Sequence, residues 1–554
     1  LMPAPTRGAH MTNNEATMLD DLRRDDWCSG RLLAFSAVDG HTDYEDGLTL
    51  RTTAVNGQPG LEAVLPDTCV LQFPGTSRAV NRVTGDCLEV ETPEGAVRGA
   101  LLDAHHLLIE GPCEIARAGD GVGHCRAGAR TLLGAAPHFD PNRIDADLDD
   151  AMARRQAWLR RCTPVAGVSA KARRTHARML SCMKTQVYSP EGRIRHRWTT
   201  PDRWPHRRMW LWDSVFHAVG WRHVDAVLAR DMISAVLDTQ REDGFVAHMM
   251  APDRVSGITQ PPVLALGVKL VHEVAPDRGW VQALYPALCA YVRWDLAHRD
   301  SDSDGLVEWA IDGDPACRSG ESGMDNSPRF DTATQLDAVD FNAFLACECE
   351  VLAAFAAELG HADDVDRWQA EHQRLCTLIS DRLWSADRRF FVDYDVERQQ
   401  QSSVLASSGF LPLICGAATA EQAACLAAHL RDPDTFGTAF PVPSIAVCDT
   451  AYYAKDMWRG PTWINVNWLI ARGLDRYGMH DLAASLRART TAEIEACCEQ
   501  FGVPFEFYDD RARVAPPELL RKGRCAPDQS PYHQVIHDYG WTATLYTDML
   551  THHG

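Results

Sequence analysis

The sequence contains no run of apolar residues close to the ~18–20 that a helix needs to cross a bilayer. It also lacks an excess of positive charge, because 55 Lys and Arg stand against 76 Asp and Glu, giving a formal net charge of −21. Nucleic acids and anionic membranes are bound through positively charged faces. We therefore expect neither a nucleic acid nor a membrane as a partner.

Two further absences concern the redox state and the location of the chain. The 18 cysteines form no framework: Cys347 and Cys349 are two apart, and Cys497 and Cys498 are adjacent, so neither pair has the CxxC spacing of metal sites. The first residues contain no apolar segment of the kind found in secretory signals. These features predict reduced thiols and a cytoplasmic protein.

Composition and apolar periodicity change near residue 148 and divide the chain into two parts. Two domains, or one very large one, are expected for a chain of 554 residues. Residues 12–147 are rich in Gly, Thr and Val and contain short alternating runs, such as CVLQF at 69–73, between turn signals. This pattern predicts a β-sandwich-like N-terminal domain. Residues 148–554 contain apolar residues at helical spacing and predict about a dozen helices.

Short insertions of one kind follow several of these predicted helices. They read REDGFVAHM at 241–249, SDSDGLVEWA at 301–310 and DRRFFVDYD at 387–395. A plain helical solenoid would explain the helices equally well. It would not explain why the loops hold most of the tryptophans, so we favour a helical toroid with its site at one mouth.

Four loop stretches interleave aromatic side chains with carboxylates, amides or arginine. They are MWLWDSVFHAVGW (209–221), ESGMDNSPRF (321–330), KDMWRGPTWINVNW (455–468) and PFEFYDD (504–510). Aromatic faces bind the C–H faces of sugars, and the polar groups bind the hydroxyls. Any single tryptophan could equally belong to the core, but four loops with the same composition indicate a carbohydrate site.

These stretches resemble the catalytic domain of glycoside hydrolase family 63 and its bacterial relatives, which include mannosylglycerate and glucosylglycerate hydrolases. The resemblance covers roughly residues 165–550 and includes GWTATLYTDML at 540–550. It implies an (α/α)6 barrel, which agrees with the helical pattern. The expected fold class is therefore mainly α, with this barrel after the β-sandwich-like domain. The resemblance also implies hydrolysis of an α-linked terminal sugar with inversion.

Within this resemblance, Asp325 corresponds to the general acid and Glu506 to the general base, although Asp509 and Asp510 lie close to Glu506 in the sequence. An inverting glycosidase needs two carboxyl groups ~6.5–9.5 Å apart, so that water fits beside the sugar. We expect Met324 to provide an apolar neighbour that keeps the acid protonated. The alternative for this stretch is a surface turn.

The resemblance implies further substrate-binding residues, each with a structural alternative. Asp213 could instead be a helix N-cap. His248 could be a buried hydrogen-bonded histidine, and Gln260 a loop amide. Arg459 could brace Asp456 or the base. The complete expected set is Trp212, Asp213, Phe216, His248, Gln260, Trp458, Arg459 and Trp463.

RDSDSDGLVEW at 299–309 matches the opening of a calcium loop, D-x-D-x-D-G. Position 12 would be Ile311 in place of Glu, which excludes an EF-hand, although Glu308 could substitute as a ligand. A solvated acidic turn is the alternative. We expect no cofactor for the chemistry and, if any metal, a structural calcium ion held by Asp300, Asp302, Asp304 and Glu308.

The expected function is an inverting, exo-acting α-glycoside hydrolase, and first an α-glucosidase acting on a disaccharide, a short oligosaccharide or a small glucoside. A glucosylglycerate or mannosylglycerate hydrolase is the alternative. Outside hydrolysis, an (α/α)6-barrel sugar epimerase or lyase could share the fold, as could a non-catalytic carbohydrate-binding protein. The expected partner is a small carbohydrate, and the sequence does not predict the oligomeric state.

Overall fold

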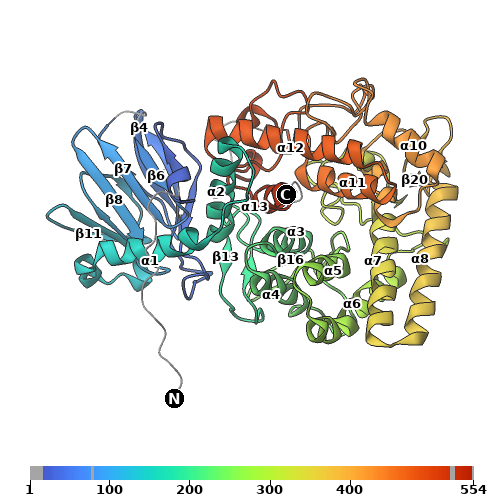
Figure 1. Cartoon of the computed structure of the whole chain (residues 1–554), viewed down its shortest axis with the longest axis horizontal. Helices are drawn as coiled ribbons and strands as arrows, with labels where there is room; N and C mark the ends of the chain where they lie inside the picture. Colours follow the sequence, from blue (N-terminus) through green and yellow to red (C-terminus); the bar gives the residue numbers. More distant parts are fainter. Residues whose placement is uncertain (1–16, 76–79, 524–530, 552–554) are drawn as a thin grey trace, which may run out of the picture.

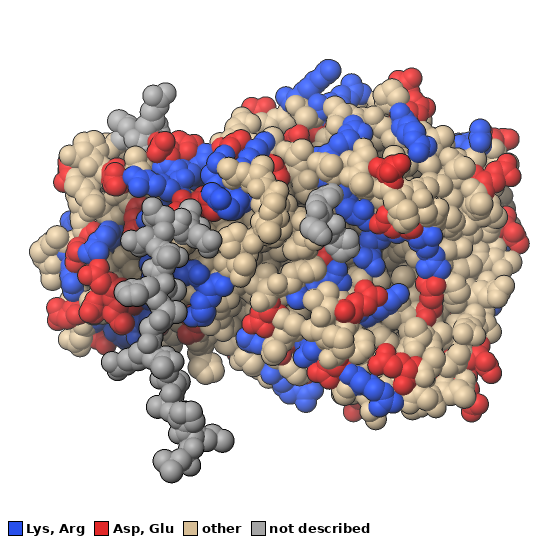
Figure 2. All heavy atoms as spheres, viewed as in Figure 1, with Lys and Arg blue, Asp and Glu red and all other residues tan. Residues whose placement is uncertain are grey.

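The computed structural model describes residues 17–75, 80–523 and 531–551. A strand-rich part and a helical part lie side by side along the long axis (Figure 1). Acidic and basic side chains are interspersed over the face shown in Figure 2. Within the described residues, no helix is long and apolar enough to cross a membrane. Residues 12–16, the expected start of the N-terminal domain, lie outside the described residues.

Two antiparallel sheets form the strand-rich part, in the orders β1-β6-β7-β8-β9-β12-β11 and β10-β5-β4-β3-β2. Their strands are β1 (Arg23–Arg24), β2 (Leu32–Ala34), β3 (Thr49–Val55), β4 (Gln58–Leu65), β5 (Cys69–Gln72), β6 (Asn81–Val83), β7 (Cys87–Thr92), β8 (Gly95–Leu101), β9 (His106–Glu110), β10 (Glu114–Ala118), β11 (Val122–Ala127) and β12 (Arg130–Ala135). Alternate residues of both sheets point into one shared core, to which Leu50, Leu61, Leu88 and Leu107 contribute. The strand-rich N-terminal region expected from the sequence is confirmed.

The first helix, α1 (Leu148–Arg161), packs on the strand-rich part although it opens the helical pattern of the sequence. Leu148 and Met152 share a small core with Ala100 and Leu108 on the outer face of the larger sheet. An ion pair of 2.6 Å between Arg98 and Asp149 adds to this contact. The apolar periodicity that indicates helices therefore begins with α1, although α1 belongs to the strand-rich part of the structure.

The helical part follows. Its helices are α2 (Ala170–Thr185), α3 (Leu211–Trp221), α4 (Ala226–Leu237), α5 (Leu264–Val274), α6 (Arg278–His298), α7 (Val339–Leu359), α8 (Ala362–Arg382), α9 (Pro412–Cys415), α10 (Ala420–His429), α11 (Ile464–Arg476), α12 (His480–Phe501) and α13 (Gly540–Thr551). Short strands lie between them, namely β13 (Val187–Tyr188), β14 (Trp198–Thr199), β15 (Met209–Trp210), β16 (Met249–Met250), β17 (Leu336–Asp337), β18 (Trp384–Ser385), β19 (Phe390–Phe391), β20 (Tyr394–Asp395) and β21 (Gln400–Gln401).

Contacts between these helices form a closed circuit that runs from α13 through α3, α5, α7, α9 and α11 and back to α13. Helices α4, α6, α8 and α12 pack against members of the circuit. Burial follows this arrangement, because every residue of α3 is buried, whereas α8 buries only Trp368, Leu375 and Ile379. A helix that belongs to the circuit is covered on all sides, so most of its faces are apolar. An outer helix is covered on one side only and needs a single apolar stripe.

The segment between α6 and α7 has little regular structure, and buried ion pairs fix it in place. Arg329, in the 3-10 turn Pro328–Phe330, donates to both oxygens of Asp340 at 2.6 and 2.8 Å and of Asp393 at 2.7 and 2.8 Å. All three side chains are buried. At the other end of the stretch, buried Glu321 accepts from Arg299 at 2.7 and 3.0 Å. Asp325 lies between these two anchors.

We predict that Arg329→Met lowers the free energy of unfolding by about 3–5 kcal/mol, because it leaves two carboxylates buried without their cation. Urea unfolding of both proteins measures the loss. Arg476→Met is the matched control, because the ion pair of Arg476 with Glu350 is partly exposed and should contribute ~0–1 kcal/mol. Equal losses in the two variants would contradict the anchoring role of Arg329.

Two histidines, His176 and His217, are buried in the fold, and a third, His537, is partly buried. Within the described residues, none of the three has an acidic partner. Burial lowers the pKa of His176 to about 4, of His217 to about 3 and of His537 to about 4. In the unfolded chain each would titrate near ~6.5. Their contribution to stability is therefore complete above that pH and is lost as the pH falls through 6.5 toward 4.

For this reason we predict a free energy of unfolding that declines between pH 7.5 and pH 5, and a weaker decline in His176→Gln. Denaturant titrations at the two pH values measure the difference. His480→Gln, at a side chain that is 74% exposed, should follow the unmodified protein. A decline that is unchanged in His176→Gln would show that His176 does not titrate on unfolding.

Candidate active site

One cavity of about 230 Å³ brings together residues from seven stretches of the helical part, between Pro201 and Trp541. Of the ten catalytic and substrate-binding residues expected from the sequence, eight line it. These are Trp212, Asp213, His248, Gln260, Asp325, Trp458, Trp463 and Glu506. The stretch 321–330 is therefore not a surface turn, since its carboxylate Asp325 faces a pocket.

The remaining two expected residues, Phe216 and Arg459, do not line the cavity. Phe216 packs behind Trp212, with ring centroids 5.8 Å apart, and contacts Trp468 and Trp541. Arg459 forms an ion pair with Asp331. Its side chain therefore braces neither Asp456 nor the expected base, although its backbone N–H donates to the Asp456 carbonyl at 2.7 Å.

Two consecutive cationic residues contact the two expected catalytic carboxylates. Arg521 donates from Nε and Nη2 to Glu506, at 2.7 and 3.0 Å, and both side chains are buried. The Lys522 ammonium lies 2.9 Å from the carboxylate of Asp325, whose side chain is 23% exposed. The carboxylates of Asp325 and Glu506 are thus each paired with a cation from the same segment, Lys522 and Arg521 respectively.

The neighbour of Asp325 differs from the one expected. Met324 is buried, but its sulfur contacts Arg329 Nη1 at 3.4 Å. The group beside the acid is the Lys522 ammonium. Burial alone would lower the pKa of Lys522, but the Asp325 carboxylate more than offsets this, so the pKa is raised.

Asp509 and Asp510, the other acids near Glu506, have structural roles and do not line the cavity. Both form ion pairs with Lys455. Asp509 accepts from the backbone N–H groups of Arg513 and Val514 at 2.8 and 3.0 Å. Of the three acids in this stretch, only Glu506 is in contact with the pocket.

Asp213 is an ionisable group buried in the pocket wall. It is the third residue of α3, whose N-cap is Trp210, so Asp213 is not a helix cap. Burial raises its pKa well above the usual range, and the nearby Asp202 carboxylate adds to the effect. The Tyr539 hydroxyl donates to it over a long 3.5 Å. A carboxyl so poorly hydrogen-bonded would gain from sugar hydroxyls as partners.

Tryptophans form the apolar walls of the cavity. Trp458 and Trp463 are stacked, with ring centroids 3.8 Å apart, and the ring centroid of Trp212 lies 6.4 Å from that of Trp458. Gln260 accepts from the Trp212 backbone N–H at 3.1 Å and so positions that wall. Burial lowers the pKa of His248 to about 4, so this pocket histidine is neutral at neutral pH.

Several residues of the pocket were not expected from the sequence. They include His206, Trp210, Arg521, Lys522, Tyr539 and Trp541. Tyr539 and Trp541 flank the start of the GWTATLYTDML stretch, which could have indicated them. Arg521 and Lys522 form a short basic pair of the kind that is usually solvated, so no local signal identified them.

The acids of the expected calcium loop do gather in space. Ligand atoms of Asp300, Asp302 and Asp304 lie within 4.8 Å of one another, as do those of Asp302, Glu308 and Asp337. Asp337 is buried, and within the described part of the chain neither of its oxygens has a hydrogen-bond partner, although Arg382 Nη2 lies 3.6 Å from one of them. Burial raises the pKa of Asp337 to about 8, and the Asp304 carboxylate contributes to the increase.

The cysteines that the structure describes are all free thiols, and most are buried. Within the described residues, the groups of side chains suited to a metal ion contain Asp, Glu and His but no cysteine. This agrees with the reduced thiols expected from the sequence.

Two solved structures resemble this chain over different lengths. A mannosylglycerate hydrolase of family 63 from Thermus thermophilus, in complex with glucose, matches with a TM-score of 0.56 and 26% identity, covering 68% of this chain and 99% of that one. A rhamnosidase from Klebsiella oxytoca matches with a TM-score of 0.51 and 13% identity, covering 97% and 98%. The second likeness shows the fold alone, and it extends over both the strand-rich and the helical parts.

Sequence comparisons point to one family. A family model described as the mannosylglycerate hydrolase MGH1-like glycoside hydrolase domain matches residues 205–509. The mannosylglycerate hydrolase of Thermus thermophilus is 28% identical over 395 residues, or 56% of this chain and 91% of that protein. The glucosylglycerate hydrolase of Mycolicibacterium hassiacum is 23% identical over 388 residues, or 52% and 84%. The chain belongs to the MGH1-like members of glycoside hydrolase family 63 and is an enzyme that hydrolyses O-glycosidic bonds.

Proposed function

We propose that the enzyme hydrolyses, with inversion, a small α-glycoside whose aglycone bears a carboxylate, of the mannosylglycerate or glucosylglycerate kind. The observation that carries this proposal is the placement of Arg521 and Lys522 against Glu506 and Asp325 in one pocket. A neutral glucoside would leave this cationic segment without a partner from the substrate. The names of the relatives at 28% and 23% identity agree with this choice over an α-glucosidase.

In the proposed mechanism Asp325 protonates the glycosidic oxygen as the bond breaks, and Glu506 removes a proton from the attacking water. Arg521 orients Glu506 through its two hydrogen bonds. The carboxylate of the aglycone takes Lys522 as its partner. Asp325 is then released from its ion pair and can hold the proton that it gives to the leaving oxygen.

The sugar lies against the aromatic side chains of the pocket. Trp212, Trp458 and Trp463 provide apolar walls for its C–H faces, while Asp213 binds its hydroxyls. A cavity of about 230 Å³ with such walls suits one terminal sugar. This supports exo-acting hydrolysis and a small aglycone.

We propose that the closed circuit of helices is the inner ring of an (α/α)6 barrel, with the candidate site at one mouth. The circuit α13-α3-α5-α7-α9-α11 and its outer partners support this assignment. The domain boundary, expected between residues 147 and 148, fits better after α1, because α1 packs on the larger sheet.

A proton NMR time course tests the proposed function. The substrates are mannosylglycerate and glucosylglycerate, compared with neutral glucosylglycerol, trehalose and maltose. We predict that an acidic glycoside releases its β-sugar first and is cut roughly 10- to 100-fold faster than its neutral analogue, because a charge-assisted contact is worth ~1.5–3 kcal/mol. Release of the α-anomer first would overturn inversion, and faster cleavage of the neutral compounds would overturn the acidic aglycone.

In the same assay, Asp325→Asn and Glu506→Gln should each lower kcat by at least ~10²–10⁴-fold, the usual contribution of a general acid or base. Thermal unfolding should show that both variants remain folded. Asp331→Asn is the matched control, since it changes a nearby carboxylate outside the pocket and should retain turnover. Full activity in either catalytic variant would remove that residue from its role.

We further propose that the acidic loop after α6 binds a structural calcium ion. Asp300, Asp302, Asp304 and Glu308 would hold it, joined by Asp337. The buried carboxylate of Asp337 has only a 3.6 Å ion pair with Arg382 and no hydrogen bond among the described residues, so it fits a hard cation with oxygen ligands. The ion would stabilise the loop and would take no part in hydrolysis.

We predict that calcium raises the unfolding temperature of the purified protein after treatment with a chelator, and that magnesium does so less because it needs a smaller octahedral site. Differential scanning calorimetry measures both. Asp302→Asn, at an acid shared by both carboxylate groups, should abolish the response. Asp243→Asn, in a comparable exposed Asp-Gly turn, should keep it. An identical unfolding temperature with and without calcium would favour the solvated turn.

A further inference from the structure

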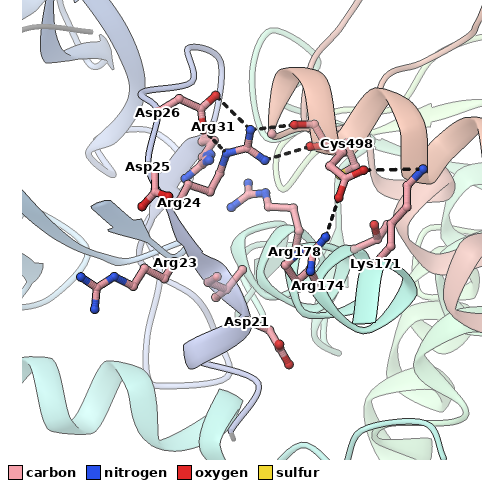
Figure 3. Close-up of a pocket in the computed structure, with 14 residues that line it drawn as sticks. Asp21, Arg23, Arg24, Asp25, Asp26, Arg31, Lys171, Arg174, Arg178 and Cys498 are labelled. Atoms are coloured by element: carbon pink, nitrogen blue, oxygen red, sulfur yellow. Dashed lines mark hydrogen bonds and ion pairs between the residues drawn. The ribbon is translucent and has the colours of Figure 1, made fainter. Parts of the chain in front are cut away.

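A second cavity, of about 260 Å³, lies where the strand-rich part meets α2 and α12. Residues 21–26 and Arg31 form one wall, and α2 and the C-terminal end of α12 form the others (Figure 3). No residue that lines this cavity also lines the candidate active site. We call it the junction cavity.

Most of the charged side chains around the junction cavity have partners. Arg24 donates to both oxygens of Asp26, at 2.9 and 3.0 Å, and to the carbonyls of Cys498 and Glu499 at the end of α12, at 3.3 and 2.7 Å. Lys171 lies 3.7 Å from the Glu499 carboxylate. These groups neutralise one another and need no further ligand.

Arg31 differs from these residues, because it is only 2% exposed and its guanidinium forms no ion pair with a described carboxylate. The one hydrogen bond of its side chain, from Nη1 to Asn81, is 3.4 Å long, while Nε and Nη2 have no partner within the described residues. These two N–H groups form the fork of a guanidinium that binds two oxygens at once. Asp26 is close, but both of its oxygens accept from Arg24.

A second guanidinium approaches the first from the opposite wall. Arg178, on α2, pairs with Asp538 through Nη2 at 2.6 and 2.7 Å, and its Nε and Nη1 have no partner within the described residues. Figure 3 shows Arg31 and Arg178 entering the cavity from different elements. Burial lowers the pKa of Arg31 to about 10, and repulsion by Arg178 contributes to the decrease. Two buried like charges without a shared counterion are costly.

We propose that the junction cavity binds a small oxyanion of the phosphate class, either inorganic phosphate or a phosphate monoester. The unpartnered N–H groups of Arg31 and Arg178 donate to its oxygens. Lys171 and Arg174, on α2, are both paired with Glu499 and contribute no free charge. Arg31 comes from the strand-rich part and Arg178 from the helical part. The bound anion therefore links the two parts, independently of the hydrolytic reaction.

Thermal unfolding of the full chain tests this proposal, with inorganic phosphate and glycerol phosphate each compared with chloride at the same ionic strength. We expect a saturable rise in the unfolding temperature of about 1–3 °C with phosphate over chloride. A larger rise with glycerol phosphate would identify a monoester as the ligand, and a larger rise with inorganic phosphate would identify the free ion. No rise with either compound would overturn the proposal.

Variants at the cavity separate a specific site from a general salt effect. Arg31→Gln should lose the response to phosphate, and in chloride it should unfold at the same temperature as the unmodified protein or higher, since it removes an unpaired buried charge. Arg31→Lys retains the charge without the fork and should respond less than the unmodified protein. Arg23→Gln changes a side chain of the same cavity that is 59% exposed and should respond fully. A full response in Arg31→Gln would overturn the assignment.

Discussion

The buried ion pairs of Arg329 with Asp340 and Asp393 determine where the candidate acid lies. The segment that carries Asp325 has little regular structure whose hydrogen bonds could fix it. Arg329 connects this segment to the start of α7 and to the stretch after β19, and Asp393 also accepts from the Val339 backbone N–H at 3.0 Å. The pocket geometry therefore depends on buried charges as well as on apolar packing.

Much of the fold could be predicted from the sequence, because alternation and helical periodicity are local properties. The strand-rich start and the helical remainder follow from them directly. The packing of α1 could not be predicted, since an amphipathic stripe fits the outer face of a sheet as well as a neighbouring helix. Only the tertiary contacts of Leu148 and Met152 distinguish the two.

In the candidate site, too, local sequence patterns could not predict which single residues reach the cavity. Trp212 and Phe216 are one helical turn apart and lie on the same side of α3, yet only the first reaches the cavity. Asp509 and Glu506 are both acids in one short stretch, and the structure separates them by their hydrogen bonds. Arg521 and Lys522 were missed because a basic pair is typical of surfaces, and its burial depends on residues far away in the chain.

The end of α12 lies between the junction cavity and the candidate active site. This helix stops at Gly502, whose left-handed backbone lies under Arg31: a Cβ there would come within 2.8 Å of Arg31 Nη2. Glu506 follows four residues later. The strand-rich part thus holds the helix end from which the candidate base extends, so it is no interchangeable module. Deleting or grafting it would alter the catalytic centre as well as the outline of the molecule.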